Sequence, residues 1–127
     1  MIRFWVSGTP VPKQSFRYKP GSGGFVNYIP ARVKEWAELV AISAKMAMQG
    51  MDILSGDLKV ILHFAMPTHR KVDVDNLSKN LLDSAKGIIF DDDRQVTYLT
   101  ITKCVSKDPG VEIIVEETEM IYEPNRL

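Results

Sequence analysis

Aspartates gather in the middle of the chain with a spacing that suggests metal chemistry. Asp73 and Asp75 are separated by one residue, and Asp91, Asp92 and Asp93 follow as a run of three. In an extended segment, side chains i and i+2 point the same way, so the carboxylates of Asp73 and Asp75 repel each other unless a cation lies between them. Mg²⁺ and Mn²⁺ prefer oxygen ligands, and Mg²⁺ often takes one or two carboxylates completed by water and substrate phosphate. The spacing therefore predicts a divalent-metal site.

Each acidic group also has a purely structural interpretation. Either aspartate of the D-x-D pair (Asp73 and Asp75) can cap a helix, because a carboxylate accepts hydrogen bonds from free backbone N–H groups. The acidic turn (residues 91–93) can be an ordinary exposed turn. A cap explains only one aspartate, however, and a metal bound by the pair needs a third ligand. We expect the acidic turn to supply it, with the strand starting at Gln95 lying beside the strand that ends at Met66.

Lys79 is the basic residue best placed to act with the D-x-D pair. It lies four residues after Asp75 and four before Asp83, so the three share one face of a helix that begins near Asp75. One interpretation is an exposed ladder of ion pairs, worth about 0.3–0.5 kcal/mol each. The other is a lysine beside a metal-bound phosphate, where it stabilises charge that develops during phosphoryl transfer.

Several other site types do not fit the sequence. Counted from Asp73, the sixth and twelfth positions of a calcium loop hold Ser78 and Ser84 instead of Gly and Glu. There is no P-loop, GxSxG or HExxH motif. The single cysteine, Cys104, excludes an internal disulfide and a cysteine-based zinc site, and we expect it to pack in or beside a strand. We expect His63 to be a packed or edge residue of a strand.

The positive charge is concentrated near the N-terminus. The chain has 16 basic and 16 acidic residues, yet residues 1–34 contain six bases and no acid. This asymmetry predicts a surface that meets a polyanion, although two ordinary solvated faces would also produce it. Residues 8–30 read as an irregular loop in which bases alternate with aromatics, which suits phosphate contact and base stacking; a surface loop folded back on the core is the alternative. The expected nucleic-acid contacts are Lys13, Arg17, Lys19, His69, Arg70 and Lys71.

The hydrophobic pattern predicts one α+β domain over residues 1–127, with a mixed sheet and two main helices in the order β-α-β-α-β-β. Apolar residues at three- and four-residue spacing indicate the helices, and alternation indicates the strands. No apolar run is long enough to span a bilayer and the N-terminus does not resemble a signal peptide, so we expect no membrane contact and a cytoplasmic protein. The expected elements are strands at 1–7, 57–66, 95–105 and 111–117, the last two forming a hairpin, and helices at 31–49 and 74–86.

The stretch VDVDNLSKNLLDSAKG, followed by DDDRQV, resembles the RusA-type Holliday junction resolvases, small endonucleases associated with phages and prophages. The family pattern is D-x-D-N-x-x-K, an apolar helix, and an Asp-rich turn ending in Q-V, and every part of it is present here. The resemblance extends over nearly the whole chain. It implies a homodimeric endodeoxyribonuclease that uses Mg²⁺, or Mn²⁺ in its place. Such an enzyme nicks opposed strands of four-way junctions or other branched DNA during recombination and repair.

The resemblance also implies which residues form the site. The metal ligands are Asp73, Asp75 and, counted back from Gln95-Val96, Asp93, with Asp92 as the alternative third ligand; Lys79 matches the family lysine. If a strand begins near Gln95, Asp93 and Gln95 share one face of it, which also favours Asp93. Two other classes remain: a catalytically silent junction-binding protein, and a structural metal-binding or interaction module. The complete acidic set argues against the first, and the acid-free N-terminal segment against the second.

Overall fold

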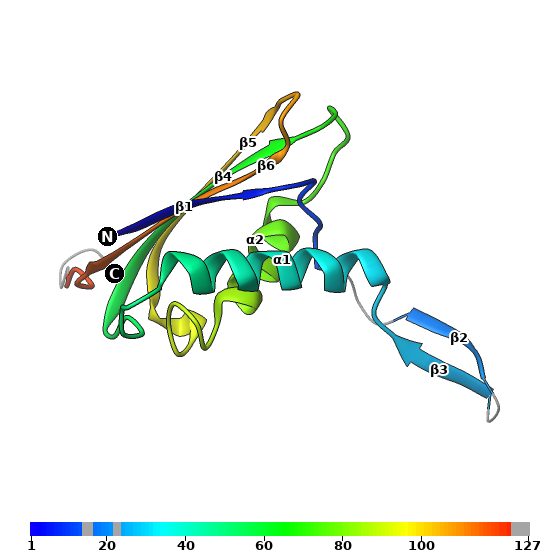
Figure 1. Ribbon diagram of the computed structural model, residues 1–127, viewed down its shortest axis with the longest axis horizontal. Coiled ribbons are helices and arrows are strands. Elements are labelled where there is room, and N and C mark those ends of the chain that lie inside the picture. The colour runs from blue at the N-terminus through cyan, green and yellow to red at the C-terminus, as the bar shows by residue number, and fades with distance from the viewer. Residues whose placement is uncertain (14–16, 22–23, 123–127) are drawn as a thin grey trace.

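In the computed structural model, one four-stranded sheet carries two helices on a single face (Figure 1). The structure describes the backbone of residues 1–13, 17–21 and 24–122, and side chains for residues 1–13 and 29–122. The elements are β1 (Ile2–Ser7), β2 (Arg17–Gly21), β3 (Gly24–Tyr28), α1 (Ala31–Ala47), β4 (Asp57–Met66), α2 (Val74–Ala85), the 3-10 helix η1 (Asp93–Gln95), β5 (Val96–Val105) and β6 (Gly110–Thr118).

The sheet is mixed, as predicted, but its strands are not in the expected order. The order is β1-β6-β4-β5, with β4 and β5 parallel and the other neighbours antiparallel. The prediction of a closing hairpin is therefore wrong, because β6 inserts between β1 and β4 instead of pairing with β5. Burial explains the choice. Val111, Ile113 and Val115 of β6 are almost completely buried, which suits a central strand, whereas most of β5 is exposed and suits an edge.

The core lies between the sheet and the two helices. Alternate residues of β4 point toward the helices, and the predicted apolar stripe of α1 meets them. The buried face of α2 completes this layer. The hydrophobic periodicity of the sequence therefore predicted the core well. The buried residues that form it are Leu58, Val60, Leu62 and Phe64 from β4, Val33, Trp36, Val40 and Ala44 from α1, and Leu77, Leu81 and Ala85 from α2.

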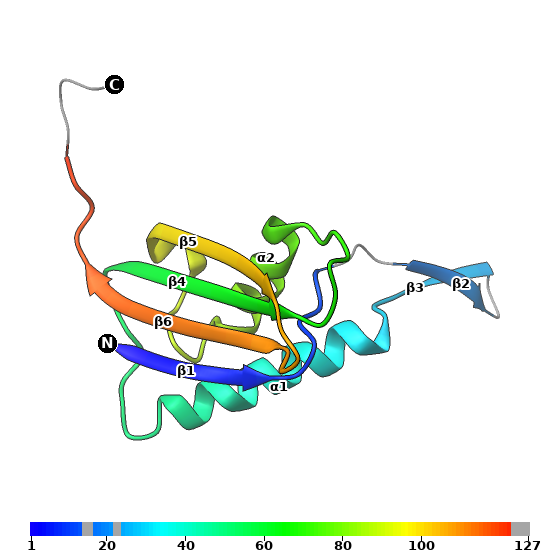
Figure 2. The same ribbon diagram turned by 90° about the horizontal axis from the view of Figure 1, so that it is seen from above.

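The two helices begin at the same end of the molecule. Arg32 in the first turn of α1 and Asp73 at the N-cap of α2 line one cavity, together with Met66 at the carboxyl end of β4. Figure 2 shows both helices behind the sheet, with the β4–α2 connection at this end. Because a helix carries partial positive charge at its N-terminus, both helix dipoles favour a negative ligand here.

The segment expected to be an irregular loop contains a two-stranded hairpin, so that expectation is wrong. Strands β2 and β3 pair antiparallel from Arg17↔Tyr28 to Gly21↔Gly24. The hairpin projects from the N-terminal end of α1, away from the four-stranded sheet (Figures 1 and 2). The side chains of Arg17 and Lys19, both expected to contact DNA, lie outside the described residues. In the part of the chain that is described, no helix is long and apolar enough to cross a membrane.

Candidate functional site

The D-x-D pair lies at the start of α2. Asp73 is the N-cap, and its Oδ1 accepts a hydrogen bond from the backbone N–H of Asp75 at 2.9 Å, which confirms the capping interpretation for this residue. Asp75 lies in the first turn, and both carboxylates are exposed. The partial positive charge of the helix N-terminus stabilises two like charges placed so close together. Capping occupies one oxygen of Asp73, so its second oxygen and the whole Asp75 carboxylate remain available to a cation.

Beside the pair lies a basic cleft with a volume of about 470 Å³. Four basic side chains and one acidic side chain, Asp73, line the cleft, so its electrostatic potential favours a polyanion. The cleft opens at the carboxyl end of β4, where the two helix N-termini also lie. One side is lined by Thr9, Pro10, Pro12 and Lys13, and the other by Met66, Pro67, Thr68, Arg70, Lys71, Val72 and Asp73, with Arg32 and Asn76 completing the cleft. The four bases are Lys13, Arg32, Arg70 and Lys71.

Polar contacts from α2 hold one wall of the cleft in place. The side chain of Asn80, which is buried, donates to the carbonyl of Val11 at 2.9 Å, and the backbone N–H of Lys13 donates to the carbonyl of Asn76 at 2.9 Å. The amine of Lys13 also pairs with Asp83. Asp83 therefore pairs with the wall of the cleft and not with Lys79. Lys79 itself is exposed, one helical turn after Asp75.

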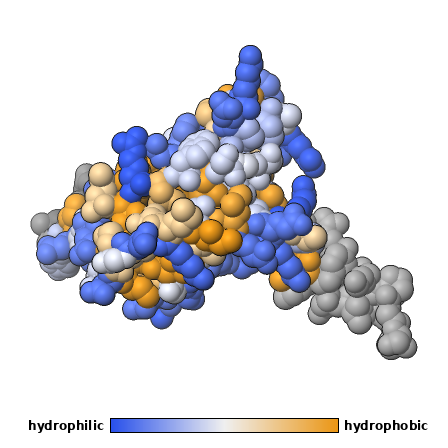
Figure 3. All heavy atoms as spheres, viewed as in Figure 1, coloured by the Kyte–Doolittle hydropathy of each residue, from blue (hydrophilic) through white to orange (hydrophobic). Residues whose placement is uncertain are grey.

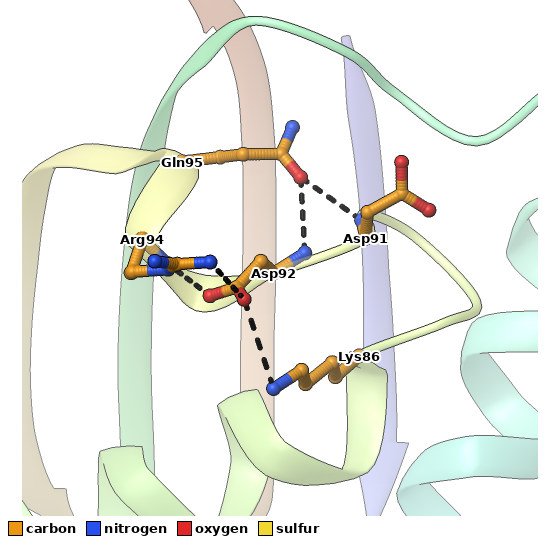
Figure 4. Close-up of polar contacts among 5 residues, drawn as sticks. All are labelled: Lys86, Asp91, Asp92, Arg94 and Gln95. Carbon is orange, nitrogen blue, oxygen red and sulfur yellow. Dashed lines mark hydrogen bonds and ion pairs between the residues drawn. The ribbon is translucent and has the colours of Figure 1, made fainter.

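The acidic turn is held by a single glutamine (Figure 4). The Gln95 Oε1 accepts hydrogen bonds from the backbone N–H groups of Asp91 and Asp92 at 2.9 and 3.0 Å. Its Nε2 donates to the carbonyls of Leu54 and Gly56 at 3.1 and 3.0 Å. The turn is thereby tied to the segment that precedes β4. The Q-V motif at the end of the turn consequently has a structural explanation that is independent of metal binding.

Asp92 is already engaged within this turn. Its carboxylate accepts from the backbone N–H of Arg94 at 2.9 Å and from the Arg94 guanidinium at 3.1 Å, and the amine of Lys86 lies 4.0 Å away (Figure 4). These hydrogen bonds, the backbone one first, lower the pKa of Asp92 from 3.8 to about 2, and the same pair raises the pKa of Arg94. Asp93, by contrast, is exposed. A third metal ligand from this turn is therefore better supplied by Asp93 than by Asp92.

The face alternation expected for Asp93 and Gln95 is absent, because residues 93–95 form a 3-10 helix and the strand begins only at Val96.

The D-x-D pair and the acidic turn lie at opposite ends of α2 within one chain. Because β5 runs parallel to β4, Val96 lies beside Leu58 and far from Met66. Met66 is at the other end of a strand that spans roughly 30 Å, and α2 spans roughly 18 Å between the two groups. Among the described residues, no three His, Cys, Asp or Glu side chains come together as a metal site. The expectation that the acidic turn folds back onto the pair in the same chain is wrong.

The remaining predicted residues divide between two cavities. Arg70 and Lys71 line the basic cleft, while His69 lines a smaller cavity of about 130 Å³ near Lys103, which Arg70 also borders. Arg32, which lines the basic cleft, was not among the residues predicted to contact nucleic acid. It lies in the acid-free N-terminal segment, two residues after Pro30, where a helix starts. This position could have been used to predict the contact from the sequence.

His63 and Cys104 contact each other and belong to neither the D-x-D pair nor the acidic turn. His63 is half-buried on β4, as expected, with its Nε2 3.4 Å from the Cys104 sulfur and its Nδ1 in contact with the Thr102 hydroxyl. Cys104 lies on a strand, but its exposed position contradicts the expectation that it is packed.

A family model and one curated relative name the same family. The family model described as "Endodeoxyribonuclease RusA" matches residues 7–116. The crossover junction endodeoxyribonuclease RusA of Aquifex aeolicus (strain VF5) is 31% identical over 114 residues, which cover 88% of each chain. The uncharacterized protein YqaN of Bacillus subtilis (strain 168) is 26% identical over 137 residues, which cover 91% of this chain and 96% of that protein.

The hydrogen bonds of Asp92 predict a specific pH dependence of stability. Since folding lowers the pKa of Asp92 from 3.8 to about 2, its contribution to the free energy of unfolding is present above pH 3.8 and is lost as the pH falls toward 2. In Asp92→Asn, this part of the pH dependence should be missing, while Asp91→Asn should behave like the wild type. Urea unfolding between pH 2 and 5 measures the difference. Equal pH slopes for the wild type and Asp92→Asn would contradict the assignment.

Proposed function

Because the chain belongs to the RusA family of endodeoxyribonucleases, we propose that it resolves four-way DNA junctions by paired nicks, in recombination and repair. In this proposal the residues that carry the reaction lie at the start of α2. The observation that supports it most directly is the position of the D-x-D pair beside the basic cleft. A carboxylate pair alone would repel a phosphate backbone, whereas four flanking bases and two helix N-termini attract it.

The basic cleft is suited to hold the DNA backbone without reading its sequence. Lys13, Arg32, Arg70 and Lys71 are charged side chains from three separate segments, and together they would grip several phosphates. Asn80 contributes indirectly, since it fixes the segment that carries Lys13. Such contacts position the scissile phosphate and leave specificity to the shape of the junction. The proposal therefore predicts recognition of branched DNA in preference to a base sequence.

The D-x-D pair fits the requirements of Mg²⁺. The free oxygen of Asp73 and the Asp75 carboxylate provide two hard oxygen ligands, and Mg²⁺ sites commonly use one or two carboxylates with water and phosphate. When bound there, Mg²⁺ would polarise the scissile phosphate and lower the pKa of the attacking water. Lys79, one turn along α2, would place a fixed positive charge near the same phosphate and stabilise its developing negative charge.

We further propose that the active form is a homodimer with two composite sites. Two symmetric nicks require two sites related by a two-fold axis, which a C2 dimer supplies. In each site the D-x-D pair of one chain would be completed by Asp93 of the partner subunit. The separation of the two acidic groups along α2 supports this arrangement, since one chain does not bring them together.

Removing one charge from the D-x-D pair tests its proposed role in metal binding. Asp73→Asn and Asp75→Asn should each abolish Mg²⁺-dependent nicking of a synthetic junction while junction affinity is kept or raised, because a negative charge near phosphate is removed. Asp91→Asn is the matched control and should cut normally. Single-turnover cleavage and gel-shift titrations measure both quantities. If the wild type binds junctions but cuts none with Mg²⁺ or Mn²⁺, the chain is a silent junction-binding protein instead.

A mixing experiment tests the composite sites. Asp75→Asn and Asp93→Asn should each be inactive as homodimers. A mixed dimer contains one site with both defects and one with neither, so co-refolding the two variants should restore nicking of one strand. If each site were instead formed within one chain, every site in the mixture would carry one of the two substitutions, and no nicking would be recovered. Absence of any recovered nicking, with mixed dimers verified by tagged pull-down, would refute the shared site.

The salt dependence of binding tests the cleft. Affinity for a junction should fall steeply with salt, because each neutralised phosphate releases counterions. Arg70→Ala with Lys71→Ala should weaken binding to all junction sequences alike and reduce the slope of log K against log salt by about 2. Lys59→Ala, an exposed lysine on β4 that does not line the cleft, is the matched control. An unchanged slope in the double variant would exclude the cleft as the DNA surface.

A further inference from the structure

The β4–α2 loop (residues 67–72) carries two bases of the basic cleft, Arg70 and Lys71, and leads directly into Asp73. Only Val72 of this loop is partly buried, where it packs against the core, and the other side chains are exposed. The surface at this end of the sheet is mainly hydrophilic in Figure 3. Apolar burial therefore fixes the loop weakly, and such a segment opens easily unless polar contacts hold it.

One polar contact ties the loop to another element within the described part of the chain. The amine of Lys103 on β5 donates a hydrogen bond to the carbonyl of Val72. The other hydrogen bond of the loop is internal, since the backbone N–H of Arg70 donates to the Thr68 hydroxyl at 3.2 Å. Lys103 therefore holds the end of the loop that adjoins Asp73.

The sheet places Lys103 on the side of the helices. Lys103 pairs in register with Phe64 of β4, which is completely buried beneath the helices, and paired residues of neighbouring strands share one face of a sheet. The backbone N–H of Ser106, just after β5, donates to the carbonyl of Met66 at 2.8 Å, so the carboxyl ends of the two strands are held together. The amine thus reaches the start of α2 from a strand that β4 fixes in place.

The charge of Lys103 is not placed where it would stabilise the fold. The N-terminus of a helix carries partial positive charge, so a cation at this end of α2 is unfavourable by itself. The ion pairs of the described residues do not include Lys103, although it is the single charge in the strand sequence VTYLTITKCV. Its amine instead holds a carbonyl one residue away from the D-x-D pair.

Basic side chains lie on both sides of the loop that Lys103 holds. Lys103 lines the cavity of about 130 Å³ together with His69 and Arg70, and no acid lines it. Met66, Thr68 and Arg70 line both this cavity and the basic cleft, so the loop separates the two. A movement of the loop would therefore displace the bases of the cleft and the start of α2 together.

From these contacts we propose that Lys103 is a positioning residue of the nuclease site. By holding the Val72 carbonyl, its amine fixes the chain at the residue before Asp73, and with it the placement of the Asp73 carboxylate and of Arg70. It acts through the backbone and does not touch the reacting atoms. A displacement of about 1 Å in a reacting constellation can lower a rate about a hundredfold, so such a tether matters. This inference rests on the proposed function and adds a residue of β5 to its site.

Two other roles for an exposed lysine give different measurable results. If Lys103 contacted a DNA phosphate, its removal would reduce the slope of log K against log salt by about 1. If it served only the stability of the fold, its removal would lower the free energy of unfolding of the whole chain. A positioning residue changes neither quantity and instead changes the rate of the reaction and the opening of one loop.

Lys103→Met keeps the length of the side chain and removes its charge and its donor. Single-turnover nicking of a saturating synthetic junction should slow about tenfold to a hundredfold. Junction affinity should change by less than about threefold, with the salt slope of the wild type, because the phosphate contacts are kept. Lys103→Arg retains a charged donor and should recover most of the rate. Lys107→Met, in the exposed turn after β5, is the matched control and should cut normally.

Limited proteolysis with trypsin, without DNA or metal, measures the tether itself. The peptide bonds after Arg70 and Lys71 lie in the exposed loop, so the rate of their cleavage reports how often the loop opens. Mass spectrometry follows this rate site by site. In Lys103→Met it should rise severalfold relative to cleavage elsewhere, while the urea midpoint matches that of Lys107→Met. Lys103→Arg should restore the cleavage rate of the wild type.

An unchanged nicking rate in Lys103→Met, or no selective increase in cleavage of its loop, would overturn the inference. A salt slope reduced by about 1 would make Lys103 a DNA contact instead. A lower urea midpoint with faster cleavage at every site would make its role structural. A wild type that cuts no junction would disprove the proposed function, whereas selective opening of the loop in Lys103→Met would still identify the tether.

Discussion

The parallel pairing of β4 with β5 decides where every acidic side chain of the site lies. A parallel connection returns the chain to the starting end of the sheet, and α2 is the element that carries it back. The D-x-D pair, which follows β4, and the acidic turn, which precedes β5, must therefore occupy opposite ends of α2. A metal site that uses both groups then requires a second chain, so the topology of one protomer sets the symmetry of the proposed enzyme.

The electrostatics at the carboxyl end of β4 follow from the same topology. Helices α1 and α2 both begin there, and the bases of the cleft come from the segments before and between them and from the first turn of α1. Asp73 is thus the one acid among several positive groups, and its capping bond to the Asp75 N–H holds it in place. Asn80 links the two sides of this arrangement, since a buried amide on α2 fixes the backbone at Val11. The cleft consequently combines attraction for phosphate with a place for a cation.

The acidic turn shows that neighbouring identical residues can have different roles. Asp92 caps η1 and pairs with Arg94, which lowers its pKa and commits its oxygens, while Asp93 remains exposed. The Gln95 side chain bonds backbone groups of the turn and of the segment before β4, so a motif shared with a nuclease family has a folding role here as well as any catalytic one.

The sequence by itself predicted the two main helices, the four strands of the main sheet and most of the core. Helix α1 and strand β4 lie where periodicity predicted them, and Asp73 caps α2, because these features depend on local spacing. Only the tertiary structure decided the strand order, the β2–β3 hairpin and the separation of the acidic groups. Each depends on which distant segments pair, and alternation in β5 and β6 is the same whether they neighbour each other or flank β4. Arg32 joins the cleft for the same reason: its charge is visible in the sequence, but its proximity to Asp73 arises only when two helices begin at one end of a sheet.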